Sequence, residues 1–238
     1  AALGSVPRSI NDPITTNDVN VSGFLNMLVA ARDAKVKRFV YAASSSTYGD
    51  HQALPKVEDV IGKPLSPYAI TKYVNELYAD VFGKTYGTDV IGLRYFNVFG
   101  PKQSPNGAYA AVIPLFMQAL KDNKPATING DGEQTRDFTF VENAVQANIL
   151  GMTSTNQTAF NEVYNIAFGE RFSINDLFKI ISKILKTKQK PIFQENRKGD
   201  VKHSLANIDK AKNLLNYQPH IDFKTGLQIT LQHFLMTN

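Results

Sequence analysis

The spacing of apolar residues predicts alternating helices and strands in the first part of the chain. Apolar side chains recur at helical intervals from 14 to 34, and a second helix is predicted from 67 to about 86. Short apolar runs at 37–43 and 88–95 are typical of buried parallel strands. Strands that alternate with helices in this way predict an α/β fold, with a parallel sheet and helices on both faces.

A serine triplet and a tyrosine–lysine pair are the most informative polar residues. The triplet, at 44–46, follows the first predicted strand, at the edge where open α/β sheets bind ligands. Tyr68 and Lys72 lie one turn apart near the start of the second predicted helix. A neighbouring cation lowers the pKa of a tyrosine, ordinarily about 10, and would let Tyr68 act as a base. The Tyr-x-x-x-Lys spacing alone is common on solvated helix faces, so the serine triplet is what favours a catalytic set.

Composition narrows the possible chemistry. The 238 residues include no cysteine and four scattered histidines, so disulfides and thiolate catalysis are excluded and no metal site is predicted. No apolar run approaches the roughly 18–20 residues of a membrane span. The net charge of +5 is spread out, apart from lysines at 179–190 that are typical of a solvated helix face and loop. We expect a cytoplasmic protein that binds neither nucleic acid nor membrane; an anionic small substrate would suit the positive charge.

Several segments carry a resemblance to a known family. They lie in family order at 4–9, 17–23, 41–50, 66–72, 94–100, 129–138 and 197–204, and include Tyr-Ala-Ala-Ser-Ser-Ser-Thr-Tyr-Gly-Asp and Arg-Tyr-Phe-Asn-Val-Phe-Gly. Together they resemble the extended short-chain dehydrogenases/reductases, specifically the NAD-dependent nucleotide-sugar 4-epimerases, and within these the enzymes acting on UDP-N-acetylglucosamine. The resemblance implies a Rossmann-like doubly wound parallel sheet with a smaller α/β substrate-binding domain.

The resemblance also sets the expected boundaries. A partial NAD-binding domain would comprise 1–98 and about 137–168, and a nucleotide-sugar domain about 99–136 and 169–238. The chain looks amino-truncated relative to the family, because the first strand, the glycine-rich phosphate loop and the acidic residue for the adenosine ribose would all precede Gly4. As written, the chain would hold the catalytic and sugar-binding side of the site without the phosphate cradle for NAD.

The implied reaction is C4 epimerisation of UDP-N-acetylglucosamine to UDP-N-acetylgalactosamine through a 4-keto intermediate, with NAD as cofactor. Tyr68 would take the proton of the C4 hydroxyl, Lys72 would bind the nicotinamide ribose and lower the tyrosine pKa, and Ser44 would hydrogen-bond the C4 oxygen. The implied cofactor contacts are Asn20, Tyr41, Tyr68 and Lys72. The implied substrate contacts are Gly4, Ser5, Ser44, Ser45, Asn97, Ala111, Val112, Arg136, Arg197, Asp200 and Ser204.

The resemblance assigns parts of the substrate to particular residues. Asn97 would contact the diphosphate, and Arg136 and Arg197 would clasp it. A guanidinium suits this role because it offers phosphate a planar fork of donors. Asp200 would bind the uridine ribose. Ser204 would face the sugar 2-substituent, where a small side chain leaves room for an N-acetyl group.

The serine segment also bears on the type of reaction. No acidic residue lies between Ala42 and Tyr48, whereas the family's dehydratases and decarboxylases place one beside the catalytic hydroxyl, so an epimerase is favoured. The open alternatives are a UDP-N-acetylglucosaminuronate or UDP-glucose 4-epimerase and a non-catalytic nucleotide- or RNA-binding member of the family. The helices at 15–34 and 67–86 resemble a pair that forms a four-helix dimer interface, so a homodimer is expected. Polysaccharide biosynthesis is the implied process.

Overall fold

The computed structural model describes residues 2–106, 110–195 and 201–237. The helices are α1 (Val6–Asn11), α2 (Pro13–Asn17), η1 (Asp18–Ser22), α3 (Gly23–Asp33), η2 (Ser45–Tyr48), α4 (Pro67–Tyr86), α5 (Val112–Lys121), α6 (Val141–Thr153), η3 (Gln157–Ala159), α7 (Ile174–Leu185), α8 (Asp209–Leu215) and α9 (Phe223–Thr237). The strands are β1 (Arg38–Ser44), β2 (Asp89–Tyr95), β3 (Val98–Phe99), β4 (Thr127–Asn129), β5 (Thr135–Arg136), β6 (Thr139–Phe140), β7 (Glu162–Ile166), β8 (Phe172–Ser173) and β9 (Ile192–Gln194).

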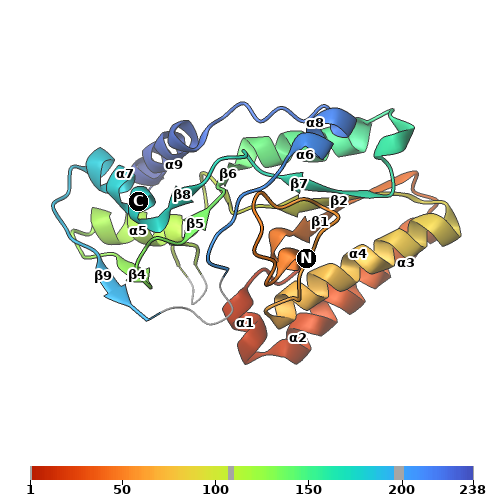
Figure 1. Cartoon of the computed structure of the whole chain (residues 1–238), viewed down its shortest axis with the longest axis horizontal. Coiled ribbons are helices and arrows are strands. Elements are labelled where there is room, and N and C mark those ends of the chain that lie inside the picture. Colours follow the sequence, from red (N-terminus) through yellow and green to blue (C-terminus); the bar gives the residue numbers. More distant parts are fainter. Residues whose placement is uncertain (1, 107–109, 196–200, 238) are drawn as a thin grey trace.

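The central sheet has three parallel strands in the order β1-β2-β7. Its register pairs Ser44 with Tyr95 and Tyr95 with Ile166, so the three carboxyl ends meet at one edge. Figure 1 shows α3 and α4 on one side of this sheet and α6 and α8 on the other. This arrangement confirms the predicted α/β fold with a parallel sheet, and it places the serine triplet at the carboxyl edge.

Helix α4 begins where its own sequence fixes the start. The Ser66 hydroxyl caps it by accepting a hydrogen bond from a backbone N–H of the first turn (3.2 Å). Pro67 takes the first helical position, where its missing N–H removes no helical hydrogen bond. These two residues place Tyr68 in the first turn and Lys72 one turn further along, as the sequence predicted.

The helix predicted at 14–34 is instead three consecutive segments. Between α2 and α3 lies η1, a π-helical turn. The turn carries Asn20, whose buried side chain accepts a hydrogen bond from Leu3 N (2.7 Å) and donates to Thr71 Oγ1 (3.1 Å). The π turn therefore aims an amide at both α4 and the segment before α1, and apolar periodicity alone contains no sign of it.

A second apolar core lies beside the sheet. Strands β3 and β6, β4 and β9, and β5 and β8 pair two by two. Together with α5, α7 and α9 they surround a core rich in phenylalanine, in which the rings of Phe138 and Phe223 stack with centroids 4.9 Å apart. Residues 206–217, expected in the smaller domain, pack through α8 against the core of the central sheet. The predicted domain boundaries stay a prediction.

Tyr41 is a correction to the predicted cofactor contacts. Its side chain is 7% exposed and lies in the apolar cluster between β1 and the α3–α4 pair, with its ring 5.2 Å from that of Phe24. Its hydroxyl fills the space left by Gly92 on the neighbouring strand. A strand that is apolar on both faces shows no alternation that would indicate which side chains face a helix. The structure therefore makes Tyr41 a core residue.

The packing of Tyr41 can be tested through Gly92. A Cβ added there would lie 2.6 Å from the tyrosine hydroxyl, so Gly92→Ala should lower the free energy of unfolding by about 1–3 kcal/mol. Urea unfolding followed by circular dichroism measures this change. Gly23→Ala is the matched control, because the nearest atom to its added Cβ is 3.9 Å away, and it should be neutral or stabilising. Equal stability of Gly92→Ala and the parent would contradict this packing.

Candidate active site

Ser44 is the last residue of β1, and its hydroxyl oxygen is already an acceptor. Ser46 donates to Ser44 Oγ twice, from its backbone N–H (3.2 Å) and from its own hydroxyl (2.9 Å). Because a serine oxygen has two lone pairs, the Ser44 proton remains available for donation. It can be donated to Tyr68, with which the Ser44 side chain forms a hydrogen bond. The structure therefore places the first and third serines of the triplet in contact, with Tyr68 beside the first, and the catalytic roles of Ser44 and Tyr68 stay a prediction.

Tyr68 and Lys72 lie on one face of α4, in a partly desolvated setting. Burial raises the pKa of Tyr68, and the hydrogen bond from Ser44 opposes that shift because it favours the phenolate. Burial lowers the pKa of Lys72, and the carboxylate of Glu76 opposes that shift. The Lys72 ammonium, 5% exposed, donates to the carbonyl oxygen of Ala42 on β1 (2.8 Å). In the described structure this lysine is thus held by the strand beside the serines.

A cavity of about 170 Å³ opens beside these residues. We call it the serine pocket; the polar side chains that line it are those of Ser44, Ser45, Ser46, Tyr48, Lys56, Ser66, Asn97, Arg136, His203 and Ser204. No aspartate or glutamate is among its described lining residues. Its polar wall therefore combines hydroxyl groups with cations, which suits a ligand rich in oxygen acceptors.

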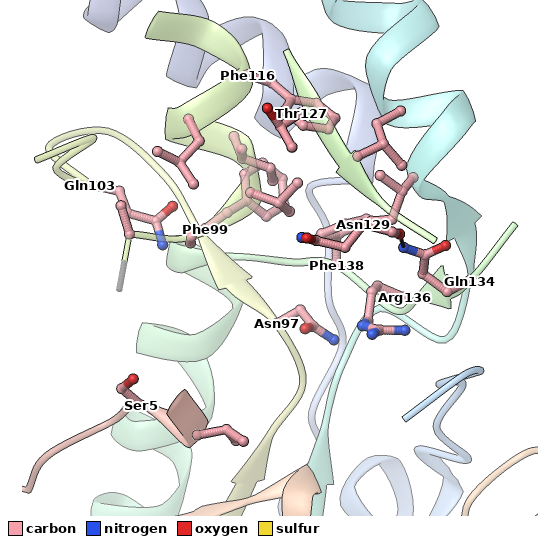
Figure 2. A pocket seen from close by; sticks show the side chains of 18 of the residues that line it. Ser5, Asn97, Phe99, Gln103, Phe116, Thr127, Asn129, Gln134, Arg136 and Phe138 are labelled. Carbon is pink, nitrogen blue, oxygen red and sulfur yellow. Dashed lines mark hydrogen bonds between the residues drawn. The ribbon is translucent and has the colours of Figure 1, made fainter. Parts of the chain in front are cut away.

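A larger cavity, of about 390 Å³, lies next to it between α5 and β4. We call it the strand pocket, and Figure 2 shows side chains that line it. Six of the predicted substrate residues line it: Gly4, Ser5, Asn97, Ala111, Val112 and Arg136. The two pockets share Val6, Asn97 and Arg136 in their walls. They can therefore hold two parts of one extended ligand, with these shared residues at the junction.

Asn97 and Arg136 are the polar residues at this junction. Asn97 has a positive φ of 32°, which asparagine tolerates better than most residues, and its amide donates to Asp137 O (3.3 Å). The Arg136 guanidinium donates from Nη1 to the backbone oxygens of Thr135 (2.9 Å) and Lys202 (3.2 Å). Figure 2 shows both side chains below Phe138 in the wall of the strand pocket. Both therefore lie where the two pockets adjoin.

The remaining predicted residues have three different outcomes. Ser45 and Ser204 line the serine pocket, and Ser204 is 9% exposed. Asn20 uses its amide to hold Leu3 and α4, so its contact with a cofactor stays a prediction. Arg197 and Asp200 lie outside the described residues. The structure therefore brings together the predicted catalytic residues and most of the predicted substrate residues.

Sequence reasoning missed two groups of lining residues. Lys56 lines the serine pocket, is 2% exposed and donates from Nζ to His51 O. Burial lowers its pKa. The second group lines the strand pocket and consists of Phe116, Thr127, Ile128, Asn129, Gln134 and Gln194. No motif or periodicity marks either group, because Lys56 comes from a loop and most of the others from short strands.

Tyr68 and Lys72 fit the nicotinamide ribose of NAD. Of the three donors of the Lys72 ammonium, one is used by Ala42 O in the described structure, so the others can reach ribose hydroxyls. The sequence contains no G-x-G-x-x-G loop for the pyrophosphate. The residues present thus suit the nicotinamide end of the cofactor.

Two other kinds of site find no support in residues 2–106, 110–195 and 201–237. No helix in this part of the chain is long and apolar enough to cross a membrane. The same residues contain no group of three or more histidine or acidic side chains placed to hold a metal ion.

A parallel α/β sheet with a serine, a tyrosine and a lysine at its carboxyl edge is typical of the short-chain dehydrogenases/reductases. The chain belongs to the NAD dependent epimerase/dehydratase family, whose sequence profile matches residues 1–167. This confirms the predicted family and fold class, and the family's dependence on NAD confirms the predicted cofactor.

Individual relatives are similar over nearly the whole chain. The UDP-glucuronate 4-epimerase of Thermodesulfobacterium geofontis is 36% identical over 97% of this chain and 69% of its own length. The UDP-glucose 4-epimerase of Mycolicibacterium smegmatis is 33% identical over 98% of this chain and 74% of its own length. The solved structure of UDP-N-acetylglucosamine 4-epimerase from Methanobrevibacter ruminantium M1, in complex with UDP-N-acetylmuramic acid, matches with a TM-score of 0.94 and 39% identity over 100% of this chain and 76% of that one.

Proposed function

We propose that this protein is an NAD-dependent 4-epimerase that interconverts UDP-N-acetylglucosamine and UDP-N-acetylgalactosamine. The observation that carries the proposal is the placement of Ser44 at the carboxyl end of β1 and of Tyr68 in the first turn of α4, beside a pocket whose described lining contains no carboxylate. Reversible oxidation at C4 needs a base for one hydroxyl proton, and it needs none of the additional acid that elimination of water requires. Relatives named as UDP-sugar 4-epimerases support the same reaction.

The roles follow from what each side chain can do. Tyr68 takes the proton of the C4 hydroxyl, and Ser44 donates a hydrogen bond to the same oxygen. NAD, when bound, supplies a reversible hydride acceptor. Lys72 holds the nicotinamide ribose through the donors that Ala42 leaves free. With Lys72 charged, the region around the phenol favours the phenolate, which brings the tyrosine closer to its working form.

The strand pocket would take the nucleotide. Arg136 and Asn97 at the junction are placed to bind the diphosphate, and the peptide groups and apolar atoms of Ala111 and Val112 would pack around the nucleoside. Binding energy from this remote group can position the reacting sugar in the serine pocket. Arg197 and Asp200 keep their predicted roles on the diphosphate and the uridine ribose.

The finer substrate assignment depends on Ser204. Its side chain lines the serine pocket and is small, so the pocket has room for the N-acetyl group at C2. One observation favours a second candidate, the uronic acid form of the same sugar: Lys56 and Arg136 line the serine pocket without any described carboxylate, which suits an added negative charge at C6. A relative named as a UDP-glucuronate 4-epimerase agrees with that candidate.

We also propose a cytoplasmic homodimer that serves polysaccharide biosynthesis. Large apolar side chains are exposed on α4, namely Ile70 (52%), Leu77 (49%) and Val81 (52%), and on α3, Met27 (59%). Packing this face against a second copy would remove it from water. Analytical ultracentrifugation of the natural full-length protein should show a dimer, and a monomer at all concentrations would refute the assembly.

Proton NMR tests the reaction. The NAD-loaded, full-length protein is incubated with UDP-N-acetylglucosamine, with UDP-glucose and the uronate in parallel tubes. The anomeric signals should show UDP-N-acetylgalactosamine appearing, with little change in the UDP-glucose tube. Conversion of the uronate alone would establish the second candidate. Conversion of none of the three sugars, with NAD demonstrably bound, would refute the proposed function.

A further inference from the structure

Behind the catalytic pair, α4 carries a buried carboxylate that the reaction itself does not use. Glu76 follows Lys72 by one helical turn and Tyr68 by two, so the three side chains lie along one face of the helix. Glu76 is 6% exposed. A carboxylate is rarely buried to this extent unless it is paired.

Its partner is Arg94 on the neighbouring strand β2. Arg94 donates from Nε to one carboxylate oxygen (2.9 Å) and from Nη2 to the other (2.7 Å), which makes a bidentate ion pair. Arg94 is itself 4% exposed. Its third nitrogen donates to Glu58 O (2.8 Å). Arg94 lies opposite Ala43 in the sheet register, next to the position of Ser44. The ion pair therefore joins the tyrosine helix to the strand that supports the serine edge.

The same carboxylate also reaches the serine turn. Thr47, which is fully buried in η2, donates from its hydroxyl to Glu76 Oε1 (3.4 Å). Glu76 thus contacts three elements: the helix that carries Tyr68 and Lys72, the strand β2, and the turn that follows Ser44. A side chain that ties these elements together fixes the distance between the serine and the tyrosine.

We propose that Glu76 is a positioning residue of the active site, which with Arg94 and Thr47 holds Tyr68 and Lys72 against the serine turn and balances the charge of Arg94 beside them. This rests on the proposed function, because the tyrosine and lysine must work as a base and a ribose-binding cation. No described lining residue of either pocket belongs to this ion pair. Glu76 acts through its neighbours and does not touch the sugar.

Removing one member of the ion pair should shift the pKa values of the neighbouring groups, in a direction that depends on which member is removed. The titratable groups that surround the ion pair are Tyr41 on β1, Tyr48 on η2, Glu58 on the loop before α4, and Lys72 on α4. Without the Glu76 carboxylate, Arg94 would remain as an unpaired buried cation. The Glu76 carboxylate raises the pKa of Lys72, so its loss would lower that pKa. We expect the pKa of Tyr68, one turn from Lys72, to move in the same direction, because an unpaired buried cation favours the phenolate. Without Arg94, the unpaired carboxylate would raise both.

The test combines a pH–rate profile with a direct titration. In the NAD-loaded, full-length enzyme, Glu76→Gln should move both limbs of the kcat/KM profile to lower pH by about one unit, and Arg94→Met should move them to higher pH. Carbon-13 NMR of labelled tyrosine, with the Tyr68 signal identified from Tyr68→Phe, should show the same displacement. The titration needs no substrate, so it remains informative even if no UDP-sugar is epimerised.

Three further variants separate positioning from plain stability. The double variant Glu76→Leu, Arg94→Met removes both charges, so its pH limbs should return close to those of the parent. Thr47→Val should lower kcat by about tenfold without moving the limbs, since it loosens the serine turn and changes no charge. Asp80→Asn removes the carboxylate of an exposed pair with Lys84 (2.7 Å) on the same helix and should change neither quantity.

Two results would overturn the proposal. One is a Glu76→Gln enzyme with a lower melting temperature but an unchanged pH profile and tyrosine titration, which would make the ion pair purely structural. The other is the same direction of shift in Glu76→Gln and Arg94→Met. If either Glu76→Gln or Arg94→Met does not fold, the direction of the pH shift in the variant that folds decides whether the proposal stands.

Discussion

Tyr68→Phe should lower kcat by ~10²–10⁴-fold and leave the affinity for UDP nearly unchanged, because only the proton transfer is removed. The phenylalanine keeps the ring, and Tyr68 lines neither the serine pocket nor the strand pocket where the nucleotide would bind. The hydroxyl that is lost is the one hydrogen-bonded to Ser44. NMR turnover with UDP-N-acetylglucosamine gives kcat, and calorimetry with UDP gives the affinity.

Tyr73→Phe is the matched control, because it makes the same change on the same helix at a position with no proposed contact to the sugar or the cofactor. Its turnover should equal that of the parent. In the parent, burial raises the pKa of Tyr68, so kcat should increase with pH as the phenolate forms. A Tyr68→Phe enzyme that turns over at a near-normal rate would end the assignment of Tyr68 as the base.

Ser204→Tyr should change which sugars the enzyme accepts. Ser204 lines a cavity of only about 170 Å³, and its backbone is fixed by a hydrogen bond from its N–H to Thr135 O (3.1 Å). A tyrosine ring placed there would occupy the space proposed for the N-acetyl group. We expect kcat/KM for UDP-N-acetylglucosamine to fall by at least ~10²-fold, while the value for UDP-glucose stays at or above that of the parent. Competition between the two sugars in one NMR tube measures the ratio.

The control for this change is Ser204→Ala, which keeps the side chain small and should leave the preference for the N-acetylated sugar intact. It also tests whether the serine hydroxyl itself contributes. An equal loss of both activities in Ser204→Tyr would show that the position supports the loop at 203–206 and does not select the substituent.

Local signals in the sequence were sufficient to predict the positions of the elements that carry the proposed catalytic residues. The apolar run before Ser44 and the cap formed by Ser66 and Pro67 are encoded within a few neighbouring residues, so β1 and the start of α4 lie where they were predicted. The carboxyl-edge rule then brings Tyr68 close to Ser44 without any knowledge of long-range contacts.

Features that depend on distant partners could not be predicted in this way. The π turn at Asn20 exists because its amide reaches Leu3 and Thr71, which are 17 and 51 residues away. Tyr41 lies on the helix-covered face of a strand that is apolar on both faces, so its direction had no signature. The strand pocket is assembled largely from two- and three-residue strands such as β4 and β5, which are too short to show a period.

The fate of the hydrogen on C4 tests the central claim most directly. UDP-N-acetylglucosamine carrying deuterium at C4 is incubated with the NAD-loaded, full-length enzyme in ordinary water, and the product is examined by NMR and mass spectrometry. The account predicts UDP-N-acetylgalactosamine that keeps its deuterium at C4, because the hydrogen removed from that carbon returns to it without exchange with solvent. A product that has lost its deuterium to water would contradict a reversible oxidation at C4 by Ser44, Tyr68 and Lys72.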